Sequence, residues 1–226
     1  MHYCLLTIPF FIISMIGDML ARKKNILKYV KIFQPLTTFI AAIAAALSLF
    51  MPEHQLRYTI PILIGLLVST YADSILVNRD DKSALIKGML IFFLALLIYG
   101  ITLTAFNGFH KADIIICGIL LIFYSLLMIG FIRKTEGKMS MKARIPAMIY
   151  AANFCFVISR AISCFYGTEF SKAQAILLTV GTISFFLGDL QLGIYQYINK
   201  KFPMFQAPPF YFVGQLLIGL SASYFA

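Results

Sequence analysis

Eight long apolar runs follow one another along the chain, each bounded by charged residues or by Pro and Gly clusters. A helix needs about 20 predominantly apolar residues to cross a bilayer. Lipid cannot satisfy free backbone groups, so a spanning segment is a helix or part of a closed barrel, and the short alternating segments of a barrel are absent. The pattern therefore predicts an all-α, polytopic integral membrane protein with eight transmembrane helices in a single domain, residues 1–226. The expected spans are residues 3–20, 33–51, 58–77, 84–106, 113–132, 145–165, 174–198 and 209–225.

Composition supports this interpretation. Hydrophobic residues make up 61% of the 226 residues and charged residues 12%, whereas a soluble domain has about 25% charged residues. Eight spans would use roughly 160 residues, and the remainder is too short for a separate nucleotide-binding module. The composition thus excludes a soluble enzyme, a disordered chain and a large extramembrane domain.

The formal net charge is +10, which in a soluble protein would favour a nucleic-acid partner. Here the basic residues alternate between connections, as they do when cytoplasmic loops collect Lys and Arg. The first, third, fifth and seventh connections carry 14 of the 19 Lys and Arg residues, and the even-numbered ones carry 3. We therefore expect a multi-pass protein of the cell membrane, with both termini outside the cytoplasm and with no nucleic-acid partner.

A short motif around an aspartate occurs in the third and seventh spans, as residues 71–76 and 187–192, and again in the first as residues 16–20. An even number of helices separates the third span from the seventh, so the two motifs approach the same membrane side. The recurrence of this motif is compatible with a pseudo-repeat of four helices plus four.

Ionisable side chains inside a span are costly and usually face a cavity or a partner. Asp73 and Asp189 lie in the cytoplasmic halves of the third and seventh spans, and we interpret them as a functional carboxylate pair. The structural alternative is an interhelical hydrogen bond or an ion pair with Lys87. Asp18 is expected at an interfacial helix end, and Arg160, near an outer helix end, is expected to bind headgroups or to pair locally, outside the site.

More polar residues are expected at the depth of the two aspartates. Gln34, Thr37 and Thr38 lie at the inner end of the second span, and Tyr211 and Gln215 are one turn apart in the last. Convergence of polar side chains from several helices at one depth favours a site that opens toward the cytoplasm.

Two acids in a cleft of low dielectric constant suit general acid–base hydrolysis of an acid-labile ether or acetal. Mutual repulsion would keep one acid protonated. This acid delivers a proton to the substrate, and an oxocarbenium-like centre forms. The other carboxylate then activates or orients water. Apolar walls suit a substrate with an acyl or alkenyl chain. The chain lacks a Gly-x-Ser-x-Gly motif, a His-Glu-x-x-His zinc motif and a Gly-rich phosphate loop, so neither a metal nor a cofactor is expected.

At these positions the chain resembles the YhhN-like membrane proteins, a family that includes lysoplasmalogenases. The resemblance rests, in chain order, on Gln34-Pro35-Leu36-Thr37-Thr38, the motif around Asp73, the spacing of Gly88, Phe92, Ala95 and Tyr99, the motif around Asp189, and Tyr211 with Gln215. It implies an eight-helix membrane fold and hydrolysis of the vinyl ether bond of lysoplasmalogens to a fatty aldehyde and a glycerophospho-base. The partners would be this lysophospholipid and the membrane lipids.

On this basis the two motif aspartates are the predicted catalytic pair. The predicted substrate-binding residues are Gln34, Thr37, Thr38, Lys87, Tyr99, Tyr211 and Gln215. Two positions depart from the family pattern: Gln34 stands where a Lys is common, and Leu96 where a His is frequent. If the family's Lys binds phosphate, or its His moves a proton, the activity of this protein would change.

Two other functions fit the same pattern. A small transporter or permease would use the aspartates to bind a proton or cation and would place polar residues along the full depth of the bundle. A non-catalytic lipid-binding protein would bind a lysolipid without yielding product. The sequence leaves open the head group, the chain length, the oligomeric state and the regulation.

Overall fold

The computed structural model describes residues 3–77, 81–134, 141–198 and 207–224, and within these ranges it has no β-strand. The helices that it describes are, in chain order, the 3-10 turn η1 (Tyr3–Leu6), α1 (Thr7–Lys23), α2 (Leu27–Leu47), the 3-10 turn η2 (Ser48–Phe50), α3 (Leu56–Ile75), α4 (Lys82–Asn107), α5 (Lys111–Lys134), α6 (Met141–Ser163), α7 (Lys172–Tyr197) and α8 (Ala207–Ser221).

The prediction of an all-α membrane fold is confirmed over this part of the chain. Seven helices are long and apolar enough to cross a membrane, when η1 is joined to α1 and η2 to α2. The eighth, α8, has 15 residues, about 22 Å at 1.5 Å per residue, which is shorter than a hydrocarbon core of roughly 30 Å. The described residues therefore contain eight helices but not eight full-length spans.

The connection between α1 and α2 is shorter than predicted. We expected a basic loop from residue 21 to residue 32, but α1 continues to Lys23 and α2 begins at Leu27. Lys and Arg are good helix formers, and their long side chains reach the membrane surface from within a helix, so charge alone does not end one. As a result Gln34 lies two turns inside α2, and Asp18 more than one turn inside α1.

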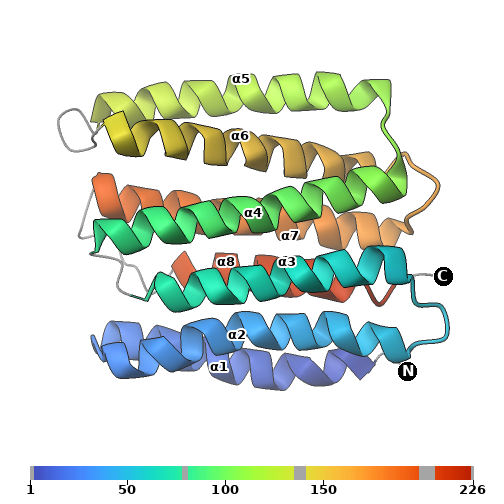
Figure 1. The fold of residues 1–226 in the computed structure, drawn as a ribbon, viewed down its shortest axis with the longest axis horizontal. Coiled ribbons are helices and arrows are strands. Elements are labelled where there is room, and N and C mark those ends of the chain that lie inside the picture. The colour runs from blue at the N-terminus through green and yellow to red at the C-terminus, as the bar shows by residue number, and fades with distance from the viewer. Residues whose placement is uncertain (1–2, 78–80, 135–140, 199–206, 225–226) are drawn as a thin grey trace.

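The helices form an elongated bundle in which each lies nearly parallel or antiparallel to its neighbours (Figure 1). From one edge to the other, α1 packs on α2, α2 on α3 and α8, α3 on α4, and α8 on α7; α6 contacts α4 and α7, and α5 packs on α6 at the opposite edge. The helices α1, α3, α5 and α7 end at one end of the bundle, which we call the inner end because it is predicted to face the cytoplasm. Both termini lie at the other, outer end (Figure 1).

Small residues bring α7 and α8 into close contact. A Cβ atom added at Gly214 would lie 2.6 Å from the carbonyl oxygen of Gly181, and one added at Gly188 would lie 2.7 Å from the backbone nitrogen of Tyr211. Packing of this kind drives helix association in lipid, where no hydrophobic force acts between helices. These contacts hold Tyr211 of α8 against the residue that precedes Asp189 of α7.

Candidate active site

Asp73 lies near the inner end of α3 and is buried. Three donors from two other helices surround its carboxyl group. From α2, Gln34 Nε2 donates to Oδ1 at 2.9 Å and Thr38 Oγ1 donates to Oδ2 at 2.5 Å, while the Tyr211 hydroxyl of α8 donates to Oδ2 at 2.7 Å. The carboxyl group thus joins α2, α3 and α8, and the prediction that Gln34, Thr38 and Tyr211 lie at its depth is confirmed.

Gln34 connects Asp73 to an ion pair on α1. Its Oε1 accepts a hydrogen bond of 2.6 Å from Arg22 Nη2, and Arg22 Nε donates to Asp18 Oδ2 at 2.7 Å. Asp18 is fully buried and lies five residues before the end of α1, so its expected place at a helix end is wrong. Since α1 continues past Asp18 for more than a turn, Arg22 lies one turn further toward the inner end and can pair with the aspartate inside the bundle.

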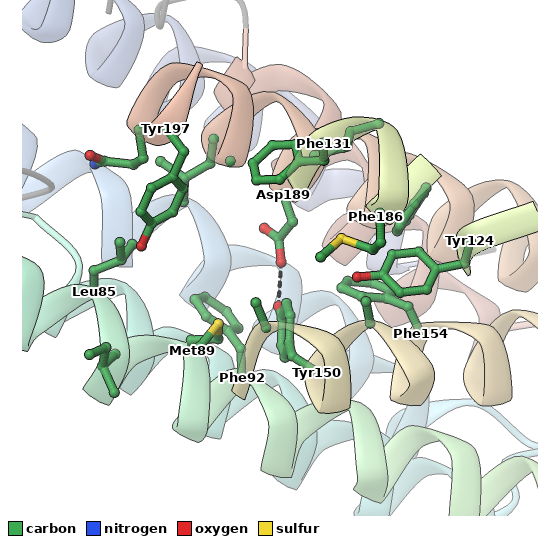
Figure 2. A pocket seen from close by; sticks show the side chains of 18 of the residues that line it. Leu85, Met89, Phe92, Tyr124, Phe131, Tyr150, Phe154, Phe186, Asp189 and Tyr197 are labelled. Atoms are coloured by element: carbon green, nitrogen blue, oxygen red, sulfur yellow. Dashed lines mark hydrogen bonds between the residues drawn. The ribbon is translucent and has the colours of Figure 1, made fainter. Parts of the chain in front are cut away.

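Asp189 is half-buried on α7, and the hydroxyl of Tyr150 on α6 donates a hydrogen bond to its Oδ2 (Figure 2). Tyr150 was not among the site residues predicted from the sequence. No signal in the sequence indicated its partner on α7, which could be identified only once the helices were placed.

A small cavity joins the two aspartates. It has a volume of about 30 Å³, which is enough for a water molecule. Its lining comes from α2, α3, α4, α7 and α8 and includes Gln34, Asp73, Leu76, Phe92, Gly188, Asp189, Leu192, Pro208 and Tyr211. Asp73 and Asp189, which are 116 positions apart in the sequence, therefore line one shared space.

A larger and almost wholly apolar cavity of about 150 Å³ adjoins the first (Figure 2). Leu76, Phe92, Asp189 and Leu192 line both cavities. The rest of the lining comes from α4, α5, α6 and α7, with Met89, Tyr124, Phe131, Phe154, Phe186 and Tyr197 among its side chains. Asp189 thus lies where the small cavity, which also holds Asp73, meets the larger apolar one.

Of the predicted substrate-binding residues, Gln34 and Tyr211 line the small cavity, and Thr38 lines neither cavity but donates to Asp73. Four others also line neither cavity. Thr37 is hydrogen-bonded to Ser14 at 2.8 Å, and the Tyr99 hydroxyl donates to Gln215 Oε1 at 3.0 Å. Gln215 in turn donates to Ser69 Oγ at 3.3 Å. The fourth, Lys87, has an exposed side chain, whereas the Asp73 carboxyl group is hydrogen-bonded to Gln34, Thr38 and Tyr211.

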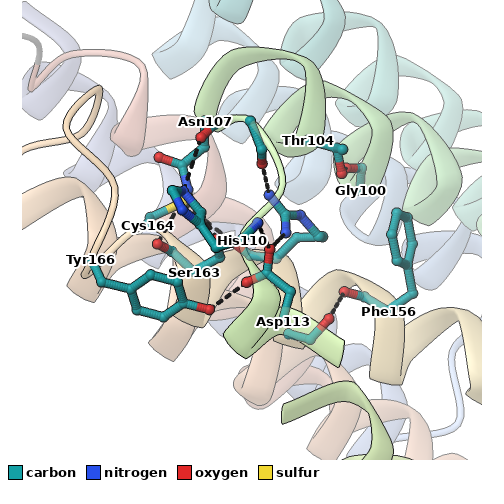
Figure 3. A network of polar contacts seen from close by, with 12 residues as sticks. Gly100, Thr104, Asn107, His110, Asp113, Phe156, Ser163, Cys164 and Tyr166 are labelled. Atoms are coloured by element: carbon teal, nitrogen blue, oxygen red, sulfur yellow. Dashed lines mark hydrogen bonds and ion pairs between the residues drawn. The ribbon is translucent and has the colours of Figure 1, made fainter. Parts of the chain in front are cut away.

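A second polar network closes the outer ends of α4, α5 and α6 (Figure 3). Arg160 is fully buried; it pairs with buried Asp113 and donates to the carbonyl of Gly108. The Tyr166 hydroxyl also donates to Asp113, and Arg160 lies over the ring of Phe109, with its guanidinium carbon 5.5 Å from the ring centre. Local pairing of Arg160 is confirmed and headgroup binding is not, because lipid headgroups cannot reach a side chain without exposed surface.

No group of three or more His, Cys, Asp or Glu side chains in the described ranges is placed to hold one metal ion. The chemistry that the inner site offers on its own is therefore that of two carboxyl groups, the hydroxyls of Thr38, Tyr150 and Tyr211, and the Gln34 amide.

Comparison with known proteins gives one match. The model of the YhhN family matches residues 30–222, a segment that begins in the first turn of α2 and includes both aspartates and both cavities. No curated protein and no solved structure matches the chain. Because the family model covers most of the chain, this membrane protein belongs to the YhhN family.

Proposed function

We propose that the protein is a membrane-embedded hydrolase that cleaves the vinyl ether bond of lysoplasmalogens and releases a fatty aldehyde and a glycerophospho-base. Membership of the YhhN family is consistent with this type of activity. The observation that carries the proposal is the shared cavity: two aspartates from distant parts of the chain line one water-sized space that adjoins an apolar one. Such a pair can supply both a proton and an oriented water to a lipid ether.

In the proposed reaction Asp189 delivers the proton. It lines the apolar cavity, where the alkenyl chain would lie. Its proton goes to the vinyl carbon that does not bear oxygen, and the double-bond electrons form the new C–H bond. The neighbouring carbon, still bonded to the ether oxygen, becomes an oxocarbenium-like centre.

Asp73 then assists the attack of water. A carboxylate only accepts hydrogen bonds, and donors from Gln34, Thr38 and Tyr211 hold Asp73 as an acceptor beside the small cavity. A water molecule there would give a proton to Asp73 and its oxygen to the oxocarbenium carbon, forming a hemiacetal. The hemiacetal collapses to the aldehyde when Asp73 returns its proton to the departing glycerol oxygen and the hemiacetal hydroxyl gives its proton to Asp189, which restores both acids.

This chemistry predicts selectivity for the bond type. A saturated ether has no double bond to protonate, so it cannot form the oxocarbenium centre by this route. The decisive experiment is to incubate the detergent-purified protein with a lysoplasmalogen and with its saturated ether analogue and to measure released aldehyde. We expect aldehyde from the vinyl form only.

The same assay tests the two acids. Asp73→Asn and Asp189→Asn should each reduce aldehyde release by at least about 100-fold, since each removes one proton-transfer group. Asp81→Asn is the matched control: Asp81 is exposed and caps α4 by accepting from the backbone nitrogen of Ser83, and Asn caps a helix equally well. It should keep full activity.

Three outcomes would count against the proposal. Full activity in either Asn variant would remove that residue from the mechanism. Uptake of a lysolipid into protein-loaded vesicles without covalent change would favour a transporter, and saturable lysolipid binding with no product at high protein concentration would favour a lipid-binding protein.

A further inference from the structure

We propose that Arg22, held by Asp18, is a positioning residue that sets the orientation of the Gln34 amide and through it that of Asp73. The inference rests on the proposed function for its kinetic readout only. Neither Arg22 nor Asp18 lines the two cavities, so the effect on chemistry passes through Gln34. The contacts form a chain across three helices, from α1 through α2 to α3.

Arg22 lies in the last turn of α1. Its guanidinium group is planar, and each of its N–H groups can only donate. Nε donates to Asp18 Oδ2 at 2.7 Å and Nη2 donates to Gln34 Oε1 at 2.6 Å. The Asp18 carboxyl is fully buried and the Arg22 side chain is 9% exposed. With Nε held by Asp18, Nη2 of the same guanidinium is directed at Gln34 on α2.

The second step concerns the Gln34 amide, which has one accepting end and one donating end. Because Arg22 only donates, the carbonyl end of Gln34 must face it. The NH₂ end must then face Asp73, where Nε2 lies 2.9 Å from Oδ1. Without Arg22, the hydrogen bond to Asp73 alone would orient the amide, and the Gln34 side chain could turn away and leave Oδ1 without its donor.

The third step concerns Asp73. With Oδ1 held by Gln34, its other oxygen Oδ2 is directed at Thr38 and Tyr211, and the carboxyl group borders the cavity shared with Asp189. A rotated Gln34 would remove one of the three hydrogen bonds that orient Asp73. Hydrogen bonds to charged groups are among the stronger ones in proteins, so the loss should appear in the chemical step.

The kinetic experiment is a double-mutant cycle on purified protein with lysoplasmalogen as substrate. Arg22→Gln should lower kcat by about 10- to 100-fold with little change in KM, because Arg22 touches neither cavity. In a Gln34→Ala background the same substitution should change kcat by less than about twofold, because its only route to Asp73 is gone. The matched control is Lys23→Gln, which removes the neighbouring positive charge from an exposed position and should leave kcat unchanged.

A spectroscopic readout separates positioning from a structural role and does not need turnover. The infrared carboxylate band of Asp73 is obtained by subtracting the spectrum of Asp73→Asn. It should shift in Arg22→Gln and stay in place in Lys23→Gln. If Arg22→Gln fails to fold because it leaves Asp18 unpaired, the Asp18→Asn/Arg22→Gln variant removes both charges and should give the same shift.

A wild-type protein that releases no aldehyde would overturn the proposed function, and the infrared band alone would then decide the role of Arg22. If Arg22→Gln behaves as Lys23→Gln in the available readouts, or if its effect on kcat adds fully to that of Gln34→Ala, Arg22 does not position Asp73.

Discussion

The contact between Gly188 and Tyr211 couples helix packing to the geometry of the site, and Gly188→Ala tests this coupling. The new methyl carbon would lie 2.7 Å from the backbone nitrogen and from the Cβ of Tyr211, whereas ordinary contacts begin near 3.4 Å. These atoms belong to or adjoin the backbone and cannot rotate away as a side-chain end would. The two helices must therefore separate locally by about 0.7 Å.

Both sides of this contact carry site residues. Gly188 precedes Asp189, and the Tyr211 hydroxyl donates to Asp73, so separation of α7 from α8 moves the two acids relative to each other. Inserting a methylene-sized group into a well-packed region costs about 1–3 kcal/mol, and a misplacement approaching 1 Å at a reacting centre can cost up to about 100-fold in rate. We expect a lower thermal unfolding temperature and a loss of aldehyde release of roughly 10- to 100-fold.

The control for this prediction is Gly118→Ala on α5. A Cβ atom there would have no neighbour within 4 Å, and Ala is a better helix former than Gly by about 1 kcal/mol, so stability and activity should be unchanged or slightly higher. Unfolding can be followed by thermal denaturation in detergent and activity by aldehyde release. If Gly188→Ala matches Gly118→Ala in both assays, the α7–α8 contact does not set the geometry of the site.

Three further predictions concern other contacts. Tyr150→Phe removes the hydroxyl that donates to Asp189, and aldehyde release should fall by about 10-fold while thermal stability changes little; unchanged release would show that Tyr150 only packs. Arg160→Met leaves buried Asp113 without its cation and should destabilise the protein by about 3–5 kcal/mol in denaturant titrations, while the specific activity of the folded fraction is retained. Tyr99→Phe should leave KM unchanged, because its hydroxyl bonds within the bundle; a raised KM would return Tyr99 to the substrate site.

The transporter alternative predicted polar residues through the whole depth of the bundle. The structure does have polar contacts in the outer half. They include the Arg160–Asp113 pair, the Asn107 amide donating to Ser163 Oγ at 3.0 Å and the Tyr58–Ser221 hydrogen bond of 2.6 Å. Their donors and acceptors are mostly satisfied by one another, which is typical of contacts that tie helices together.

The sequence by itself determined the class of fold, the approximate helix positions and the two acids of the candidate site. The bilayer imposes these features, because each span needs a minimum length of apolar residues and a charge inside a span is costly unless it faces a cavity or a partner. The boundaries of basic connections were less predictable, since Arg22 and Lys28 continue helices instead of ending them.

Only the tertiary structure decided which polar groups meet. Helices such as α4 and α5 are apolar on all sides, so hydrophobic periodicity does not indicate which face turns inward. Lipid and protein neighbours are equally apolar, and rotation of a helix about its axis is set by close packing and by interhelical hydrogen bonds instead. For that reason Tyr150 beside Asp189, Arg22 beside Gln34, and the inward-facing Tyr99–Gln215 pair could be identified only after all eight helices were in place.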